Sequence, residues 1–412
     1  MDYARISRKG LVVALTLFLA LTASAFGNHS EETAAAEQQN KFSFYKPSSE
    51  TTYYPPVKNT QVRNVVLFIG DGMGFGPVAL ARMEAAGPDA RLYMERMPVA
   101  AFVRTHSADA VVTDSAAAAT ALATGCKTNN GMVSLSPEGK KYLTILEAAK
   151  NKGMATGLVA TSTITHATPA CFAAHNKSRN NQPQIAEDLL ANKVNIILGG
   201  GREYFLPKTN TNSKRTDQKD LIDQAKKAGY LYIQTPEQLS SAQGPYLLGL
   251  FQDGALTTEG PEPALAELTE KAIEILSRKK KGLFQKKKSF FLMVEGSQID
   301  WACHGNDAAN TVRQTLLFDQ AVKAALDFAA KDKHTLVVVT ADHDTGGLVI
   351  KAAETQGKPE LSWSTKSHTA LPVPLFAYGP GAELFCGVYD NTDVPKKIAK
   401  SLGIKSFPKI LE

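Results

Sequence analysis

The chain has 412 residues, of which 43% are hydrophobic and 21% are charged. This composition is that of a globular protein, and the length fits one large α/β domain or two domains of ordinary size. The formal net charge of +6 is too small to argue for a nucleic-acid partner.

The first 25 residues have the pattern of a signal peptide. Arg5, Arg8 and Lys9 form a basic start, residues 11–21 are apolar, and the A-S-A tripeptide at 23–25 is typical of a cleavage site. The apolar run is too short to span a bilayer comfortably, and no other run approaches the ~20 residues that a membrane helix needs. We therefore expect an exported protein, periplasmic or extracellular, with no membrane span.

Residues 26–60 are polar and predict a flexible lead-in, and residues 61–412 predict a single domain. In that domain short apolar runs alternate with helical segments such as 263–278 and 310–331. This alternation predicts a three-layer α/β sandwich with a large, mostly parallel central sheet and helices on both faces. The predicted strands are residues 64–70, 99–105, 155–161, 194–200, 289–296, 335–341 and 373–379.

The stretch VVTDSAAAATALATG, residues 111–125, places one aspartate and one serine ahead of four alanines. Alanine favours helices and Gly125 is a typical helix stop, so residues 116–124 predict a short helix. Asp114 and Ser115 are then ordinary helix caps in the simplest interpretation. Alternatively, Ser115 stands at the positive end of the helix dipole, where anions bind and alkoxides are stabilised.

Polar side chains follow four of the predicted strands at the point where each strand ends. In an open α/β sheet these carboxyl ends share one edge, where ligands bind. Any one of these residues alone would more often be structural than functional, but their convergence favours a site. They are Asp71, Thr168 with His166, Glu295 with Asp300 and His304, and Asp342 with His343.

The residue types in this set are typical of metal ligands. Asp300 and His304 have i, i+4 spacing, and histidine with carboxylate is the ligand set of catalytic zinc. Asp71, Thr168 and Glu295 offer only oxygen, which suits a hard ion such as Mg²⁺. Two cations roughly 4 Å apart can stabilise both the attacking and the leaving oxygen of phosphoryl transfer.

Six motifs in order resemble those of the alkaline phosphatase family, across residues 64 to about 381. They are NVVLFIGDGMG, VTDSAAAATALATGCKTNNG, ATPA…AAHNKSR, FLMVEGSQIDWACHGND, TLVVVTADHDTGG and SHTALPVPLFAYGPG. The resemblance implies metal-dependent hydrolysis of small phosphate monoesters of broad range at alkaline pH, releasing inorganic phosphate and an alcohol. It implies that Ser115 is the nucleophile and forms a phosphoserine intermediate. It also implies a homodimer.

The same resemblance implies roles for further residues, with two Zn²⁺ and one Mg²⁺ per subunit. Arg179 corresponds to the guanidinium that grips two phosphate oxygens, a bidentate task that suits its planar fork. Asp114 orients that guanidinium. The implied ligands are Asp300, His304 and His368 for the first zinc, Asp71, Asp342 and His343 for the second, and Asp71, Thr168 and Glu295 for Mg²⁺.

Two positions depart from the best-known enteric bacterial pattern. His166 stands where that pattern has an aspartate near the third metal, and Trp301 stands where it has a lysine. The His/Trp pair resembles certain marine and cold-adapted bacterial members. His166 leaves the identity of the third ion open. Trp301 removes one cation near bound phosphate, so we expect weaker phosphate retention.

Two segments bear on the surroundings of the site. Only 25 residues separate His343 from His368, so the crown that the family inserts there is expected to be reduced, near 344–367. Residues 201–260 include the polar stretch 208–220 and are expected to form a polar surface insertion, which could supply another lid. His106, His175 and His334 match no motif and are expected to be structural or surface residues.

The four cysteines, Cys126, Cys171, Cys303 and Cys386, do not have zinc-finger spacing, and export permits disulfides without requiring them. Their pairing is left open.

Rival functions are less consistent with the motifs. A sulfatase needs a C/S-x-P-x-R motif, which the sequence TDSAAAA does not contain. A phosphodiesterase generally has threonine at the position of Ser115 and no counterpart of Arg179. A cofactor-independent phosphoglycerate mutase would be cytosolic. An exported phosphate- or metal-binding protein without catalysis remains the alternative of another class, and the retained Ser115 beside a full ligand set argues against it.

Overall fold

The computed structural model describes residues 42–48, 50, 52–58, 60–278, 289–352 and 360–411. The chain divides into two compact units, residues 1–46 and 47–412. In the described part of the first unit, the rings of Phe42 and Phe44 pack edge to face, with centroids 6.1 Å apart. The expected signal peptide (1–25) and the lead-in as far as residue 41 lie outside the described residues.

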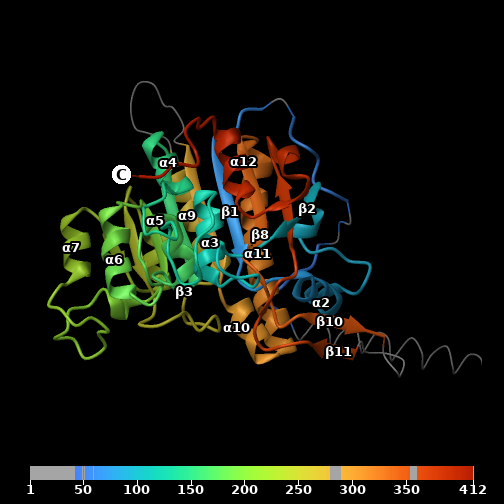
Figure 1. Cartoon of the computed structure of the whole chain (residues 1–412), viewed down its shortest axis with the longest axis horizontal. Coiled ribbons are helices and arrows are strands. Elements are labelled where there is room, and N and C mark those ends of the chain that lie inside the picture. The colour runs from blue at the N-terminus through green and yellow to red at the C-terminus, as the bar shows by residue number, and fades with distance from the viewer. Residues whose placement is uncertain are drawn as a thin grey trace, which may run out of the picture. The chain divides into compact units, whose positions relative to one another are not determined.

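A ten-stranded sheet forms the centre of the second unit (Figure 1), with strand order β14-β2-β13-β8-β1-β7-β3-β4-β6-β5. Every neighbouring pair is parallel except the two that involve β13. The expectation of a large, mostly parallel sheet is therefore confirmed. The strands are β1 Asn64–Gly70, β2 Val99–Arg104, β3 Ala155–Thr163, β4 Ile196–Gly200, β5 Leu231–Ile233, β6 Leu247–Leu250, β7 Phe290–Gly296, β8 Thr335–Ala341, β13 Val373–Tyr378 and β14 Gly387–Asp390.

Helices cover both faces of this sheet, as expected (Figure 1). On one face α11 packs against α2 and α9; on the other, α5 packs against α3, α4 and α6, and α12 packs against α3 and α4. The helices are α2 Phe75–Ala86, α3 Ser115–Thr124, α4 Ile145–Asn151, α5 Ala167–Ala173, α6 Gln182–Ala191, α7 Leu221–Lys227, α8 Pro236–Ser241, α9 Leu265–Leu276, α10 Gln298–Gly305, α11 Ala308–Asp332 and α12 Asp393–Leu402, with 3₁₀ turns η1 Met94–Arg96, η2 Arg202–Tyr204 and η3 Ala382–Phe385.

The core sits where the two helical layers meet the central strands. All residues of β1, β7 and β8 are buried, because helices exclude water from both faces of a parallel sheet. Every residue of α3 is buried as well. The small alanine side chains let α5 approach so closely that the Cys171 thiol lies 3.3 Å from the Ala116 carbonyl. All four cysteines are free thiols.

The segment expected as a polar insertion contributes two strands to the main sheet. β6 pairs with β4, and β5 pairs with β6, both in parallel. Leu247, Leu248 and Leu250 are buried, so this part of the chain extends the core. Residues 207–220, between η2 and α7, form the loop that the polar stretch predicted.

Two short antiparallel ribbons account for the described part of the expected crown, residues 344–367. One ribbon pairs β9 (Asp344–Thr345) with β12 (His368–Thr369), and the other pairs β10 (Leu348–Lys351) with β11 (Glu360–Trp363). The first ribbon carries the chain from His343 back to His368. In the described part of the chain, no helix is both long enough and apolar enough to cross a membrane.

A single buried guanidinium holds Ser48, Glu50, Thr52 and Tyr54. Arg96 of η1 donates to the Thr52 carbonyl at 3.0 Å and to the Ser48 hydroxyl at 2.6 Å, and it also pairs with the Glu50 carboxylate. Its guanidinium lies over the Tyr54 ring, 4.7 Å from the centroid. These four residues of the second unit are thus fixed around η1.

Candidate active site

The polar residues that follow β1, β3, β7 and β8 lie together at the carboxyl edge of the sheet, as their positions predicted. Asp71 follows β1 directly, and Glu295 is the second-last residue of β7. Asp342 and His343 follow β8. His166 and Thr168 come from the start of α5, just after β3. All six are brought together because parallel strands end on the same side.

Ser115 is the first residue of α3, and Asp114 is its N-cap. The Asp114 carboxylate accepts from the Ala117 amide at 2.9 Å, so the capping interpretation is correct for Asp114. Ser115 does not cap the helix. Its Oγ lies 3.2 Å from Nε2 of His343, and the residue is only 3% exposed. A hydroxyl at a helix N-terminus is therefore aimed into the group of acidic and imidazole side chains.

Asp114 also holds Arg179. The second oxygen of its carboxylate accepts from Nη1 of Arg179 at 3.0 Å and from the Gly131 amide at 3.0 Å. Nη2 of Arg179 lies 3.3 Å from Nε2 of His166. One carboxylate thus fixes both the start of the serine helix and the direction of the guanidinium, which gives an anion a charged partner beside Ser115.

Asp300, His304 and His368 form the first of three groups whose ligand atoms lie within 4.8 Å of one another. Nε2 of His304 is 3.3 Å from one Asp300 oxygen, and Nε2 of His368 is 3.6 Å from the other. Nδ1 of each imidazole contacts a backbone carbonyl, that of Lys366 or Thr113. A carbonyl only accepts, so Nδ1 carries the hydrogen and Nε2 is directed to the carboxylate.

Hydrogen bonds within this group shift the pKa values of His304 and Asp300 in opposite directions. The hydrogen bond to Asp300 raises the pKa of His304 to about 9. Burial acts to raise the pKa of Asp300, but the hydrogen bond from His304 and the nearby His343 hold it well below its ordinary value. An ionised carboxylate with two inward-facing imidazole nitrogens is a donor set that suits zinc.

Asp71, Asp342 and His343 form the second group and are completely buried. Nε2 of His343 lies 3.5 Å from Asp71 and 3.2 Å from Asp342. Burial and the neighbouring Asp342 raise the pKa of Asp71 well above its ordinary value, and burial raises the pKa of Asp342 to about 6. Burial lowers the pKa of His343 to about 4, so this imidazole is neutral at neutral pH and cannot balance the acids.

Asp71, Glu295 and His166 form the third group. Burial raises the pKa of Glu295 to about 7, because its ionised carboxylate is removed from water and, among the described residues, no cationic side chain pairs with it to offset this cost. Thr168, expected as a direct ligand here, lies buried at the start of α5, and His166 precedes it and offers a ring nitrogen to the group. The structure therefore offers a nitrogen to the third group that sequence reasoning assigned to its surroundings.

A set of buried polar atoms in the described residues lacks any hydrogen-bond partner, and most of it lies in these groups. Burying such atoms without partners costs several kcal/mol, so cations fit the donor set that they form. The atoms concerned are both carboxylate oxygens of Asp71, Oδ2 of Asp342, Oε1 of Glu295, Oγ1 of Thr168 and Nδ1 of His166.

The remaining expected site residue, Trp301, lies on α10 with 40% of its surface exposed. Its ring packs edge to face with His166 at a centroid distance of 6.2 Å. Trp301 therefore lies at the rim of the candidate site, and His166 lies between it and Arg179. The three histidines outside the motifs contact structural partners, His175 with Glu147, His106 with Asp390 and His334 with the Gln61 carbonyl.

Sequence reasoning missed Thr345 and the need for two glycines in GDGMG. Gly72 has φ of +69°, and a Cβ there would lie 2.8 Å from the Thr345 hydroxyl oxygen. A Cβ on Gly74 would lie 1.8 Å from an Asp344 oxygen. The turn after β1 therefore has to be glycine-rich, because Asp344 and Thr345, which follow β8, pack directly on it. The signal for Thr345 was its place in DHDTGG, two residues after His343.

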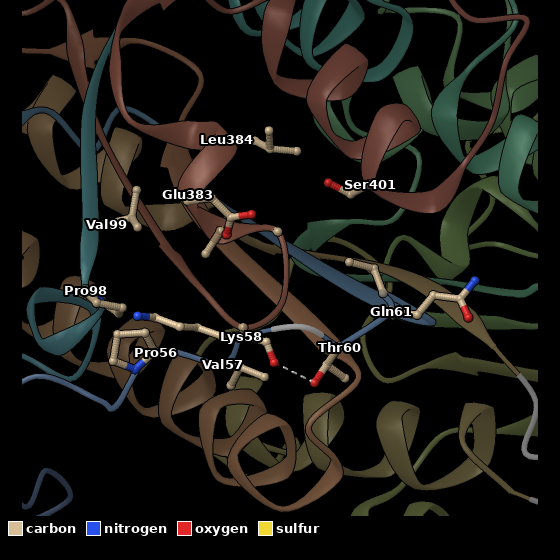
Figure 2. Close-up of a pocket in the computed structure, with 14 residues that line it drawn as sticks. Pro56, Val57, Lys58, Thr60, Gln61, Pro98, Val99, Glu383, Leu384 and Ser401 are labelled. Carbon is tan, nitrogen blue, oxygen red and sulfur yellow. Dashed lines mark hydrogen bonds between the residues drawn. The ribbon is translucent and has the colours of Figure 1, made fainter.

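A cavity of about 750 Å³ lies elsewhere (Figure 2), and none of the candidate site residues lines it. Residues 56–58 and 60–62, Val99 and Leu384 are among those around it, and the Thr60 hydroxyl donates to the Lys58 carbonyl at 3.1 Å. These residues precede β1 and begin β2, so the cavity lies at the edge of the sheet opposite Asp71. The candidate catalytic residues therefore lie at the carboxyl edge of the sheet, where the candidate metal ligands come together, and not in this cavity.

The sheet is doubly wound, and its carboxyl edge brings together a serine at a helix start with acidic and imidazole side chains. This arrangement places the chain among the α/β phosphohydrolases. The family profile described as Alkaline phosphatase matches residues 62–361 and 349–404. The chain belongs to the alkaline phosphatase family, and it is a phosphomonoester hydrolase.

Individual relatives agree with this assignment. Alkaline phosphatase 4 of Bacillus subtilis (strain 168) is 37% identical over 426 residues, which cover 83% of this chain and 89% of that protein. The alkaline phosphatase from the Antarctic bacterium TAB5 is similar in structure, with a TM-score of 0.75 and 33% identity over 84% of this chain and 99% of that one. A TAB5 variant with histidine replaced by aspartate has Mg bound in its M3 site.

Proposed function

We propose that the chain hydrolyses phosphate monoesters at alkaline pH through a phosphoserine intermediate on Ser115. The observation that carries this proposal is the position of the Ser115 hydroxyl. It begins a buried helix, faces Nε2 of His343 at 3.2 Å, and follows the aspartate that orients Arg179. A nucleophile, an anion-binding group and a helix N-terminus thus point to one place.

The residues of the chain divide the reaction between them. Arg179 holds two non-bridging phosphate oxygens through its planar fork, and the N-terminus of α3 stabilises their charge. Oγ of Ser115 forms a bond to phosphorus as the bond to the alcohol oxygen breaks. Water then hydrolyses the phosphoserine, which restores Ser115 and releases inorganic phosphate. Because the contacts are to the phosphoryl group, many alcohols are accepted.

The proposal includes two Zn²⁺ and one Mg²⁺. Asp300, His304 and His368 would hold one zinc, and Asp71, Asp342 and His343 the other. Asp71 with Glu295 and Thr168 would hold the third ion. When bound, such cations supply Lewis-acid stabilisation of alkoxide oxygens and neutralise buried carboxylates.

The identity of the third ion is the least constrained part of this assignment. The TAB5 variant that has Mg in its M3 site carries aspartate in place of a histidine. His166 offers nitrogen at the corresponding group in this chain, and nitrogen suits zinc better than it suits Mg²⁺. Trp301 and Asp114 complete the surroundings of the phosphate, at the rim and behind Arg179.

Export and assembly are also part of the proposal. The basic and apolar pattern of residues 1–25 supports transport to the periplasm or the medium, where phosphate esters of broad range would be met. The homodimer rests on the resemblance to the family alone.

The experiment that tests the function is phosphate release by the purified mature protein at alkaline pH. p-Nitrophenyl phosphate and its diester analogue are compared for wild type and Ser115→Ala, before and after chelation, and after Zn²⁺ and Mg²⁺ are restored. Monoester turnover that needs both Ser115 and metal, with a phosphoserine trapped by acid quench, supports the proposal. Diester preference, or phosphate binding without turnover, overturns it.

A further inference from the structure

Thr345 connects two of the three groups of candidate metal ligands. It lies in β9, is completely buried, and pairs across the ribbon with His368. Its hydroxyl oxygen is 2.6 Å from Oδ1 of Asp300 in the first group and 3.2 Å from Nδ1 of His343 in the second. No role was assigned to this residue from the motifs.

The protons in this chain of contacts can be counted. A threonine hydroxyl has one hydrogen, and an ionised carboxylate can only accept. The short contact to Asp300 therefore takes the Thr345 hydrogen. The hydroxyl oxygen is then an acceptor toward His343, so Nδ1 of His343 has to donate.

We propose that Thr345 is a positioning residue that fixes the tautomer of His343, and thereby leaves the lone pair of its Nε2 directed at Ser115, Asp71 and Asp342. The order of donation is His343 Nδ1–H to Thr345 Oγ, and Thr345 Oγ–H to Asp300. This inference rests on the proposed function, because it assigns Nε2 as the atom that would bind the second zinc. One hydroxyl thereby orients a ligand of each zinc site at once.

The turn at Gly72 packs directly on Thr345 and Asp300. The Thr345 amide donates to the Gly72 carbonyl at 3.2 Å, and a Cβ on Gly72 would lie within 3 Å of both the hydroxyl oxygen and Asp300. Val has the shape of Thr but no hydroxyl, so Thr345→Val removes the relay with little change in volume. Thr345→Ser keeps the hydroxyl.

The same ribbon provides a matched control. The Thr369 hydroxyl donates to Oδ2 of Asp344 at 2.7 Å, and neither group takes part in the relay. Thr369→Val therefore removes a hydroxyl and a hydrogen bond from the β9–β12 ribbon without touching His343 Nδ1. A general loosening of the ribbon would affect both valine variants, whereas loss of the relay affects Thr345→Val alone.

The test has two readouts on the full-length mature chain. The first is the tautomer of His343 in metal-stripped, ¹⁵N-histidine-labelled protein at pH 8 by NMR, with His343→Asn used to assign the signal. The second is zinc affinity by competition with a chromophoric chelator. We expect Nδ1–H in wild type, Thr345→Ser and Thr369→Val. We expect Thr345→Val to lose that preference and to bind zinc about 10- to 100-fold more weakly.

Two results would overturn the inference, an Nε2–H tautomer in wild type or an unchanged tautomer and zinc affinity in Thr345→Val. If Thr345→Val does not fold, as judged by circular dichroism, Thr345→Ala replaces it with the same expectations. The tautomer is measured without metal or substrate, so it decides the inference even if wild type neither binds zinc nor turns over substrate. Those failures would contradict the proposed function instead.

Discussion

Asp114 and Arg179 are joined by a 3.0 Å ion pair whose carboxylate also caps the helix that begins at Ser115. One oxygen serves the cap and the other serves the guanidinium and the Gly131 amide. Both side chains are about one-fifth exposed, so the pair is screened on one side only. The capping of α3 and the orientation of Arg179 are therefore coupled through a single side chain.

Two substitutions of Asp114 separate these roles. Asp114→Ala removes the cap and the ion pair, so we expect a loss of about 1 kcal/mol in the free energy of unfolding and weaker inhibition by phosphate. Asp114→Asn keeps an oxygen for the Ala117 amide but loses the charge. It should retain most of the stability while phosphate inhibition still weakens. Urea unfolding and phosphate inhibition constants measure the two effects, and equal stability loss in both variants would contradict the division.

The buried charge of Glu295 predicts a pH-dependent stability difference in metal-free protein. Its pKa is raised by burial from an ordinary value of 4.5 to about 7. The folded state therefore binds this proton more tightly than the unfolded state, and stability is lost as pH rises from about 4.5 through 7. Glu295→Gln does not ionise, so it should be more stable than wild type by about 3 kcal/mol above pH 7.5 and no more stable below pH 4.5.

Added metal should reverse this order. In the proposed assignment the Glu295 carboxylate would be a ligand when Zn²⁺ and Mg²⁺ are added, and binding to the folded state alone raises the stability of that state. Thermal melts of wild type and Glu295→Gln from pH 4.5 to 8.5, with chelator or with both metals, make the comparison. A stability difference between the two proteins that does not change with pH in chelator would refute the buried-charge explanation.

Trp301→Lys should tighten phosphate inhibition. Trp301 packs on His166, which is 3.3 Å from Arg179, so a lysine there places a further cation near bound phosphate. A charge near the surface of a site contributes about 1 kcal/mol, or roughly a fivefold lower inhibition constant. Trp301→Gln removes the ring without adding charge and should show no such tightening. An unchanged constant in Trp301→Lys would contradict the argument.

His166→Asp should favour Mg²⁺ in the third group. The substitution replaces an imidazole nitrogen beside Asp71 and Glu295 with a hard, charged oxygen. We expect Mg²⁺ affinity, measured by calorimetry, to rise at least about tenfold, since hard cations prefer carboxylate. His166→Asn supplies oxygen without charge and should give a smaller gain. Equal Mg²⁺ affinity in wild type and both variants would show that residue 166 does not face the ion.

The longer strands of the sheet were predictable because each contains a short run of mostly apolar residues, such as VVLFI in β1 and LVVV in β8. β1 and β8 begin and end where the sequence predicted, and the other predicted strands differ by one or two residues at an end. β5, β6 and β14 were missed, because runs of three or four residues carry too little pattern to distinguish a strand from a loop. They are strands because β14 pairs with β2, β6 with β4, and β5 with β6.

The sequence by itself determined the class of the protein, since its ordered motifs place carboxylates, imidazoles and a serine at strand ends and helix starts. Local chemistry suffices for that, because strand ends and helix caps are encoded within a few residues. The relay through Thr345, the nitrogen of His166 in the third group and the double use of Asp114 were decided only by the tertiary structure. Each depends on contacts between segments far apart in the chain, and such distances follow from packing rather than from any local pattern.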